Sequence, residues 1–178
     1  MPIPLQQYRL LLAKYLKPQQ GRVIGLTIAL LSSIALQIIN PQILGYFIDT
    51  AVKGGTQQTL LLVAAGFTAI ALLTQVFSVV ATYLGETVAW TATNALRINL
   101  AAHCLNLDLS FHKAHTPGEL LERVDGDVNA LSRFFSQLVI YVLGNSILLV
   151  GILVVLWFEN PLAGLCLTLF ALLALVVL

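Results

Sequence analysis

The sequence predicts an all-α fold: a polytopic membrane helical bundle with a short surface helix at the N-terminus and four membrane-spanning helices, the second and third extended into the cytoplasm. Two observations predict it. Hydrophobic residues make up 58% of the 178 residues and charged residues only 10%, whereas soluble domains carry about 25% charged residues. The apolar residues also form runs that reach the roughly 20 residues a helix needs to cross the hydrocarbon core of a bilayer.

The first element is a short amphipathic helix over residues 5–17. Leu5, Tyr8 and Leu12 share one face of this segment, while Arg9 and Lys14 lie elsewhere. This pattern is typical of a helix lying on the membrane surface. An ordinary frayed terminus is the alternative.

Four apolar runs follow, and we interpret them as spans at residues 23–48, 60–85, 134–158 and 162–178. The first three exceed the roughly 20 residues that a crossing requires, and the fourth is slightly short. The chain stops while the fourth run is still fully apolar. We therefore expect it to be an excerpt or a truncated form of a longer protein.

Within the first span, Asn40 and Pro41 predict a kink or break in the helix, because proline lacks a backbone donor and crowds the preceding turn. A pore-lining role for Asn40 is the alternative.

Basic residues predict the orientation of the spans. Four basic residues precede the first span: Arg9, Lys14, Lys17 and Arg22. Four lie between the second and third spans: Arg97, Lys113, Arg123 and Arg133. Lys53 alone lies between the first and second spans. Because lysine and arginine concentrate in cytoplasmic loops, we expect the N-terminus and residues 86–133 to be cytoplasmic. A net charge of +1, without a basic run carrying aromatics, gives no reason to expect a nucleic-acid partner.

Residues 86–133 are polar enough to lie in water, and their apolar residues recur at helical spacing. Leucines at 96, 100 and 107 recur at helical spacing. We expect the second span to continue out of the membrane to about residue 107, a cytoplasmic extension of roughly 33 Å.

A new helix begins after residue 115. Thr116 is a good N-cap, Pro117 suits the first helical position, and Glu119 at the third completes a capping box. Glu119 and Arg123 have the spacing and order of a favourable i,i+4 pair. An apolar stripe continues through Leu120, Val124, Val128, Leu131, Phe135 and Leu138. The pattern predicts one unbroken helix from Pro117 through the third span, protruding by about 25 Å.

Residues 108–115 join these two extensions at a tip far from the bilayer. The tip carries Phe111, which we expect to be exposed. Ordering a protruding hairpin buries little surface by itself, so we expect a soluble partner to receive the tip.

The loop carries a motif, and through it the chain resembles the N-terminal portion of an ABC exporter half-transporter. The matching residues are Phe111, Gly118-Glu119-Leu120, Arg123-Val124 and Asp127-Val128. The resemblance covers the whole chain in topology, with residues 5–17 as the elbow helix of that family. It implies a substrate pathway through the membrane, driven by ATP.

The resemblance also implies partners and a coupling site. Residues 108–115 would be a coupling helix that docks on a nucleotide-binding domain, with Ser110, Phe111, His112 and Lys113 as contacts and Phe111 as the buried anchor. Mg-ATP is implied for that domain, and no cofactor for this chain. A second half-transporter, identical or different, would complete the assembly in the plasma (inner) membrane.

The sequence departs from a complete exporter. It has no phosphate-binding G-x-x-x-x-G-K-[S/T] loop, and the fifth and sixth spans and the nucleotide-binding domain are missing. We therefore expect no ATPase activity from this chain alone. The alternative function is a small membrane protein that acts as an assembly or regulatory subunit.

Two other site types are disfavoured. His112 and His115 share a helical face, but no third metal ligand is evident, so we expect no metal site. The acids Glu119, Glu122, Asp125 and Asp127 lie at a helix start, where they favour the helix dipole, and we do not expect catalysis from them.

Overall fold

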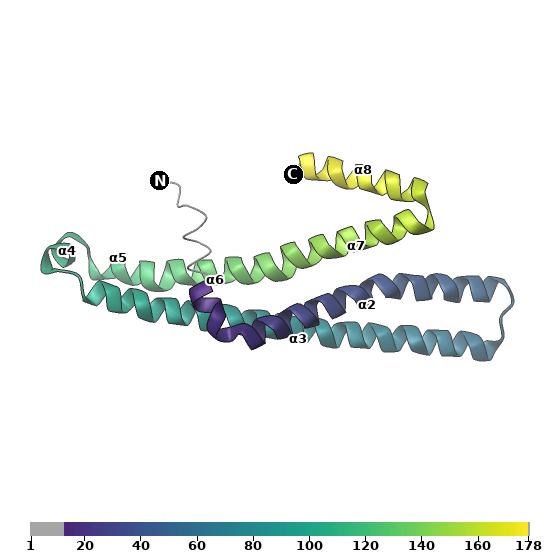
Figure 1. Cartoon of the computed structure of the whole chain (residues 1–178), viewed down its shortest axis with the longest axis horizontal. Coiled ribbons are helices and arrows are strands. Elements are labelled where there is room, and N and C mark those ends of the chain that lie inside the picture. The colour runs from purple at the N-terminus through teal and green to yellow at the C-terminus, as the bar shows by residue number, and fades with distance from the viewer. Residues whose placement is uncertain (1–12, 178) are drawn as a thin grey trace. The chain divides into compact units, whose positions relative to one another are not determined.

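The computed structural model describes residues 13–177, in which every regular element is a helix (Figure 1). A 3-10 turn, η1, covers Lys17–Gln19, and two π-helical segments cover Glu122–Asp127 (η2) and Leu138–Leu143 (η3). The α-helices are α2 (Gln20–Val52), α3 (Gln57–Leu105), α4 (Leu109–Ala114), α5 (Pro117–Leu121), α6 (Val128–Gln137), α7 (Gly144–Glu159) and α8 (Pro161–Val177). Most of the predicted surface helix at residues 5–17 lies outside the described residues.

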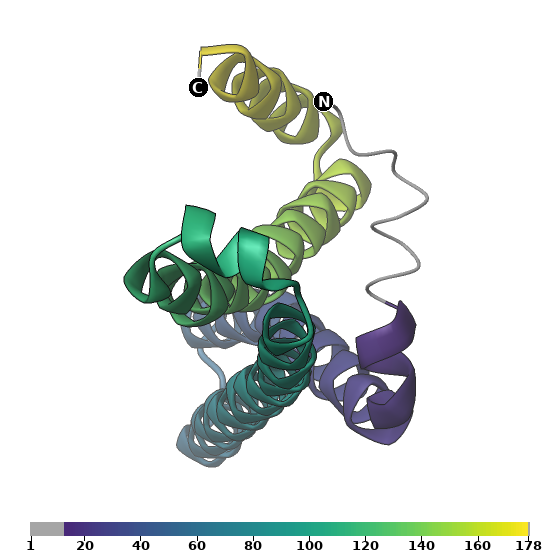
Figure 2. The same ribbon diagram turned by 90° about the vertical axis from the view of Figure 1, so that its left-hand side faces the viewer.

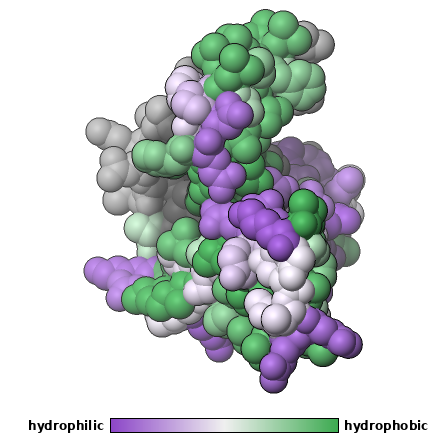
Figure 3. Space-filling view, turned by 90° about the vertical axis from the view of Figure 1, so that its right-hand side faces the viewer, coloured by the Kyte–Doolittle hydropathy of each residue, from purple (hydrophilic) through white to green (hydrophobic). Residues whose placement is uncertain are grey.

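Three stretches are helical, long and apolar enough to cross a membrane: Ala13–Val52, Gln57–Leu105 and Tyr141–Glu159. They contain the first two predicted spans and most of the third. A shorter apolar helix, Pro161–Val176, lies within the fourth, which stays a prediction. Large apolar side chains such as Val52, Phe158 and Phe170 are more than two-thirds exposed. Figure 3 shows apolar surface, in green, beside hydrophilic residues, in purple. A bilayer is the solvent that suits such a surface.

The described residues form two compact units: residues 13–29 with 79–140, and residues 30–78 with 141–177. In the first unit, polar contacts tie the N-terminal segment to α3. The Gln19 side chain is buried and its Nε2 donates to the Val88 carbonyl oxygen at 3.4 Å. Arg22 Nη1 donates to Thr91 Oγ1 at 3.3 Å, and Asn99 Nδ2 donates to the Tyr15 hydroxyl at 2.9 Å.

α3 confirms the prediction that the second span continues as one helix. It has 49 residues without interruption, a length of about 73 Å at 1.5 Å per residue. Several of its threonines donate their hydroxyls to the carbonyl oxygen four residues back, as Thr87 does to Tyr83 at 2.7 Å.

Pro41 does not end the first span. α2 runs from Gln20 to Val52 with Pro41 inside it, so the expected break is wrong, and a kink stays a prediction. The apolar surroundings of a span leave the backbone no water to bond, which favours continuing the helix past a proline. The Asn40 side-chain oxygen is buried and has no hydrogen-bond partner among the described residues.

The helix after residue 116 begins where the sequence predicts, but it is not regular throughout. Helical backbone continues from Pro117 to Glu159, and the π-helical segments η2 and η3 interrupt its α-helical hydrogen bonding. The expectation of one unbroken helix is therefore confirmed, with π-helical in place of α-helical hydrogen bonding at these two places. η2 contains Gly126, which lowers local helix propensity.

In the second unit, α7 and α8 form a tight helical hairpin. Asn160 Oδ1 accepts from the backbone N–H of Leu162 at 3.1 Å and of Ala163 at 3.2 Å, which caps the start of α8. Trp157 Nε1 donates to Thr168 Oγ1 at 3.2 Å. The two helices approach closely at Gly164, where an added Cβ would lie 3.0 Å from both Cα and Cγ of Trp157.

We predict that Gly164→Ala destabilises this hairpin. The new methyl group would press on Trp157 backbone, which cannot give way as a side-chain tip can. The overpacking cost of about 1–3 kcal/mol should exceed the helix-propensity gain of about 1 kcal/mol. Thermal unfolding of the purified protein in detergent measures the effect. Gly45→Ala is the matched control, since a Cβ there meets no atom within 4 Å. An equal or higher midpoint for Gly164→Ala than for Gly45→Ala would contradict the prediction.

Candidate functional site

The predicted tip is a short helix held at both ends by side chains. It lies where α3 gives way to α5, and Figure 2 views it from the α4 side. The helix α4 spans Leu109–Ala114, with Asp108 as its N-cap and His115 as its C-cap. These bounds coincide with the segment 108–115 expected from the sequence.

Asp108 builds the start of α4. One carboxylate oxygen accepts from the backbone N–H of Phe111 at 3.2 Å, and the other accepts from the Ser110 hydroxyl at 2.8 Å. The Ser110 hydroxyl, followed by the Phe111 N–H, lowers the pKa of this carboxyl below its ordinary value. Both bonds favour the ionised form, and a carboxylate also suits a helix N-terminus.

Phe111 folds back onto the tip. Its ring stacks on His115 with ring centroids 4.3 Å apart, and it meets His112 edge-on at 5.9 Å. The His115 backbone N–H donates to the Phe111 carbonyl oxygen at 3.1 Å. Phe111 is therefore half-buried, and the expectation of a fully exposed aromatic at this position is wrong. Stacking on a neighbouring ring removes apolar area from water.

The exposed face of α4 carries the other candidate contacts. Ser110, His112 and Lys113 are all exposed. Leu109 is 75% exposed and, at the end of α3, Leu105 is 81% exposed. Sequence reasoning passed over Leu109 in favour of the aromatic. A leucine at the first position of a short, water-exposed helix indicates an apolar contact, and this pattern is present at Leu109.

The start of α5 follows the predicted cap. Thr116 has an extended backbone, and its Oγ1 accepts from the Glu119 N–H at 3.3 Å, with Pro117 at the first helical position. The Glu119 carboxylate accepts from Arg123 Nη2 at 3.1 Å, as the i,i+4 spacing predicts. Of the remaining motif residues, Gly118 and Asp127 are exposed and Leu120 is half-buried.

An apolar cavity of about 400 Å³ lies behind the tip. Its walls come from α3, α4 and α5 with the residues that flank them: Ala101, Cys104, Leu105, His112, His115, Pro117, Leu120, Leu121 and Val124. Across the described part of the chain, no group of three or more His, Cys, Asp or Glu residues could hold a metal ion.

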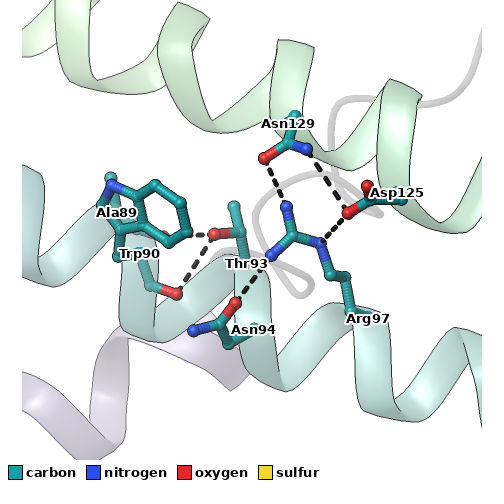
Figure 4. A network of polar contacts seen from close by, with 7 residues as sticks. All are labelled: Ala89, Trp90, Thr93, Asn94, Arg97, Asp125 and Asn129. Atoms are coloured by element: carbon teal, nitrogen blue, oxygen red, sulfur yellow. Dashed lines mark hydrogen bonds and ion pairs between the residues drawn. The ribbon is translucent and has the colours of Figure 1, made fainter.

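A polar cluster that the sequence did not reveal joins α3 to the helix that follows the tip (Figure 4). Arg97 forms an ion pair with Asp125, Nε to Oδ1 at 3.2 Å, and its Nη2 donates to Asn129 Oδ1. Its Nη1 donates to Asn94 Oδ1 at 2.7 Å. Sequence reasoning used Arg97 only for orientation, because its partners lie about thirty residues away.

We predict that Ser110→Ala raises the pKa of Asp108 toward the ordinary value of 3.8, because the Ser110 hydroxyl is the largest cause of its lowering. A lowered folded-state pKa means that the ionised cap stabilises α4 above the unfolded pKa, and that this contribution is lost as pH falls through the folded pKa. Carboxyl-carbon NMR titration of aspartate-labelled protein measures the shift. Lys113→Ala, which removes no hydrogen bond to this carboxylate, is the control. An unchanged pKa in Ser110→Ala would show that the hydroxyl is not the cause.

Comparisons with known proteins agree with this architecture. The chain is 26% identical over 162 residues to an uncharacterized ABC transporter ATP-binding protein of Bacillus subtilis, YknV, covering 88% of this chain and 26% of that protein. It is 28% identical over 149 residues to the mitochondrial iron-sulfur clusters transporter ATM1 of Gibberella zeae, covering 76% of this chain and 21% of that protein. The chain thus spans about a quarter of the length of these relatives.

The family comparison covers most of the sequence. Residues 23–178 match the model of the ABC transporter transmembrane region. This range includes every apolar helix and the hairpin with its capped tip. The chain belongs to the ABC transporter transmembrane region family.

Proposed function

We propose that this chain is part of the membrane domain of an ATP-driven exporter and that α4, with its two caps, is the element that a nucleotide-binding domain moves. The observation that carries the proposal is the capped tip. A six-residue helix is too short to be stable alone in water, yet here side chains cap its start at Asp108 and close its end at His115. An ordered, exposed helix at the end of two long helices suits a docking element.

The composition of the exposed face supports a protein partner. Leu109 supplies an apolar contact, and His112 and Lys113 lie on the same short helix with basic groups. Interfaces concentrate binding energy on a few buried apolar groups, and surrounding charges set orientation. The partner surface should therefore offer an apolar groove with acidic groups at its rim.

The remaining partners follow from the family. Mg-ATP would bind the nucleotide-binding domain, and a second half-transporter would complete the pathway. The distribution of basic residues supports a cytoplasmic N-terminus and hairpin in a plasma or inner membrane. The Gibberella zeae relative is an iron-sulfur clusters transporter.

We predict that Leu109→Ala and Phe111→Ala each lower ATP-dependent transport by about fivefold to thirtyfold in vesicles that contain the full-length assembly, as expected for loss of one buried interface contact. Leu109→Ala removes a contact with the partner, whereas Phe111→Ala loosens the tip through its stacking on His115. Nucleotide affinity should stay unchanged in both.

The control is Leu61→Ala, another exposed leucine, 63% accessible, placed in a predicted span. Leu61→Ala should leave docking of the nucleotide-binding domain intact. The measurement is the yield of cross-linking between that domain and a Lys113→Cys variant. Transport at the unsubstituted level in both tip variants would reject α4 as the coupling element.

A further inference from the structure

The polar cluster around Arg97 links α3 to the helix after the tip. Both residues that Arg97 meets there, Asp125 and Asn129, lie in the first compact unit with it. Figure 4 shows the guanidinium group between the two helices, pointing at both side chains. Asn129 Nδ2 also donates to Asp125 Oδ1 at 3.4 Å, so the two acceptors hold each other.

The arginine is well placed for a strong interaction. Its side chain is 19% exposed, while that of Asp125 is 64% exposed. The Trp90 ring lies 5.9 Å from the guanidinium carbon, which adds a cation–π contact. Nη2 and Nη1 donate hydrogen bonds to Asn129 and Asn94, and Nε lies 3.2 Å from Asp125 Oδ1 as an ion pair without hydrogen-bond geometry. A lysine ammonium cannot match this planar fork.

Asp125 lies inside the π-helical segment η2, Glu122–Asp127. π-helical turns are rare, appear mostly as single turns inside α-helices, and are frequent at functional sites. A π-helix has about 4.4 residues per turn against 3.6 in an α-helix. Across six residues, conversion of η2 to α-helix would rotate everything N-terminal to it, α5 and α4 included, by about 100° around the helix axis.

We propose that Arg97 is a positioning residue: by holding Asp125 and Asn129, it keeps η2 in its π-helical form and so fixes the rotational position of α4 and α5 relative to α3. The exposed face of α4 then points one way only. The consequence for transport rests on the proposed function, but the effect on structure does not.

The structural test measures the tip directly. Spin labels are placed at Ala102→Cys on α3 and Gly118→Cys on α5, in a full-length background with Cys104 and Cys166 replaced. Both positions are exposed, and a Cβ on Gly118 meets nothing within 4 Å. Arg97→Ala and Asp125→Asn should each convert one label-to-label distance into two or more. Arg97→Lys, which keeps the charge without the fork, should give an intermediate distribution.

Arg123→Ala is the matched control. It removes an arginine–carboxylate pair of nearly equal length, 3.1 Å, that joins η2 to α5 along the same helical path and does not involve α3. It should leave the single distance of the unsubstituted protein. The same single distance in Arg97→Ala and Asp125→Asn would overturn the proposal. If Arg97→Ala does not fold, Asp125→Asn, which keeps the side-chain shape, decides.

The functional test separates this inference from the proposed function. Arg97→Ala should lower ATP-dependent transport at least fivefold while basal ATP hydrolysis stays within twofold of the unsubstituted protein, and Arg97→Lys should recover part of the loss. Altered distances with normal transport in both Arg97→Ala and Leu109→Ala would reject α4 as the coupling element and leave the positioning role intact. Unchanged label-to-label distances in Arg97→Ala and Asp125→Asn would reject the positioning role. Lost transport in Leu109→Ala in the same experiment would leave the proposed function standing.

Discussion

The need to satisfy backbone hydrogen bonds without water shapes this chain more than any other constraint. In hydrocarbon each unpaired N–H or C=O costs several kcal/mol, so a span has to be helical along its whole length. This explains why α2 passes through Pro41 without ending and why Thr74, within the second predicted span, donates its hydroxyl to the carbonyl oxygen of Ile70.

Outside the membrane the same groups can bond to water, and local chemistry decides where helices begin. Asp108 and Thr116 each satisfy an N–H three residues on, so two helix starts lie within nine positions of each other. The hairpin can reverse direction in a short stretch because each cap needs only one side chain. The stacking of Phe111 on His115 closes the tip between the two caps.

Much of the hairpin was predictable because its signals are local. The spans follow from apolar runs, the extension of α3 from leucines at helical spacing, and the start of α5 from Thr116, Pro117 and Glu119. Interactions across the chain were not predictable. The η2 segment has no distinctive residue pattern beyond Gly126, and the partners of Arg97 become adjacent only when α3 and α6 lie side by side (Figure 1). The side-chain direction of Phe111 is a rotamer choice that spacing does not encode.

The capped tip separates two roles among neighbouring residues. Its frame uses Asp108, Phe111, His115 and Thr116, whose bonds and ring contact remain inside the tip and the first turn of α5. Leu109 and Lys113 take no part in either cap or in the ring contacts. Substitutions at these two positions therefore change the exposed surface of the tip without removing a contact that holds it. In evolutionary terms, the exposed surface of such a tip can diverge one residue at a time while its caps stay unchanged.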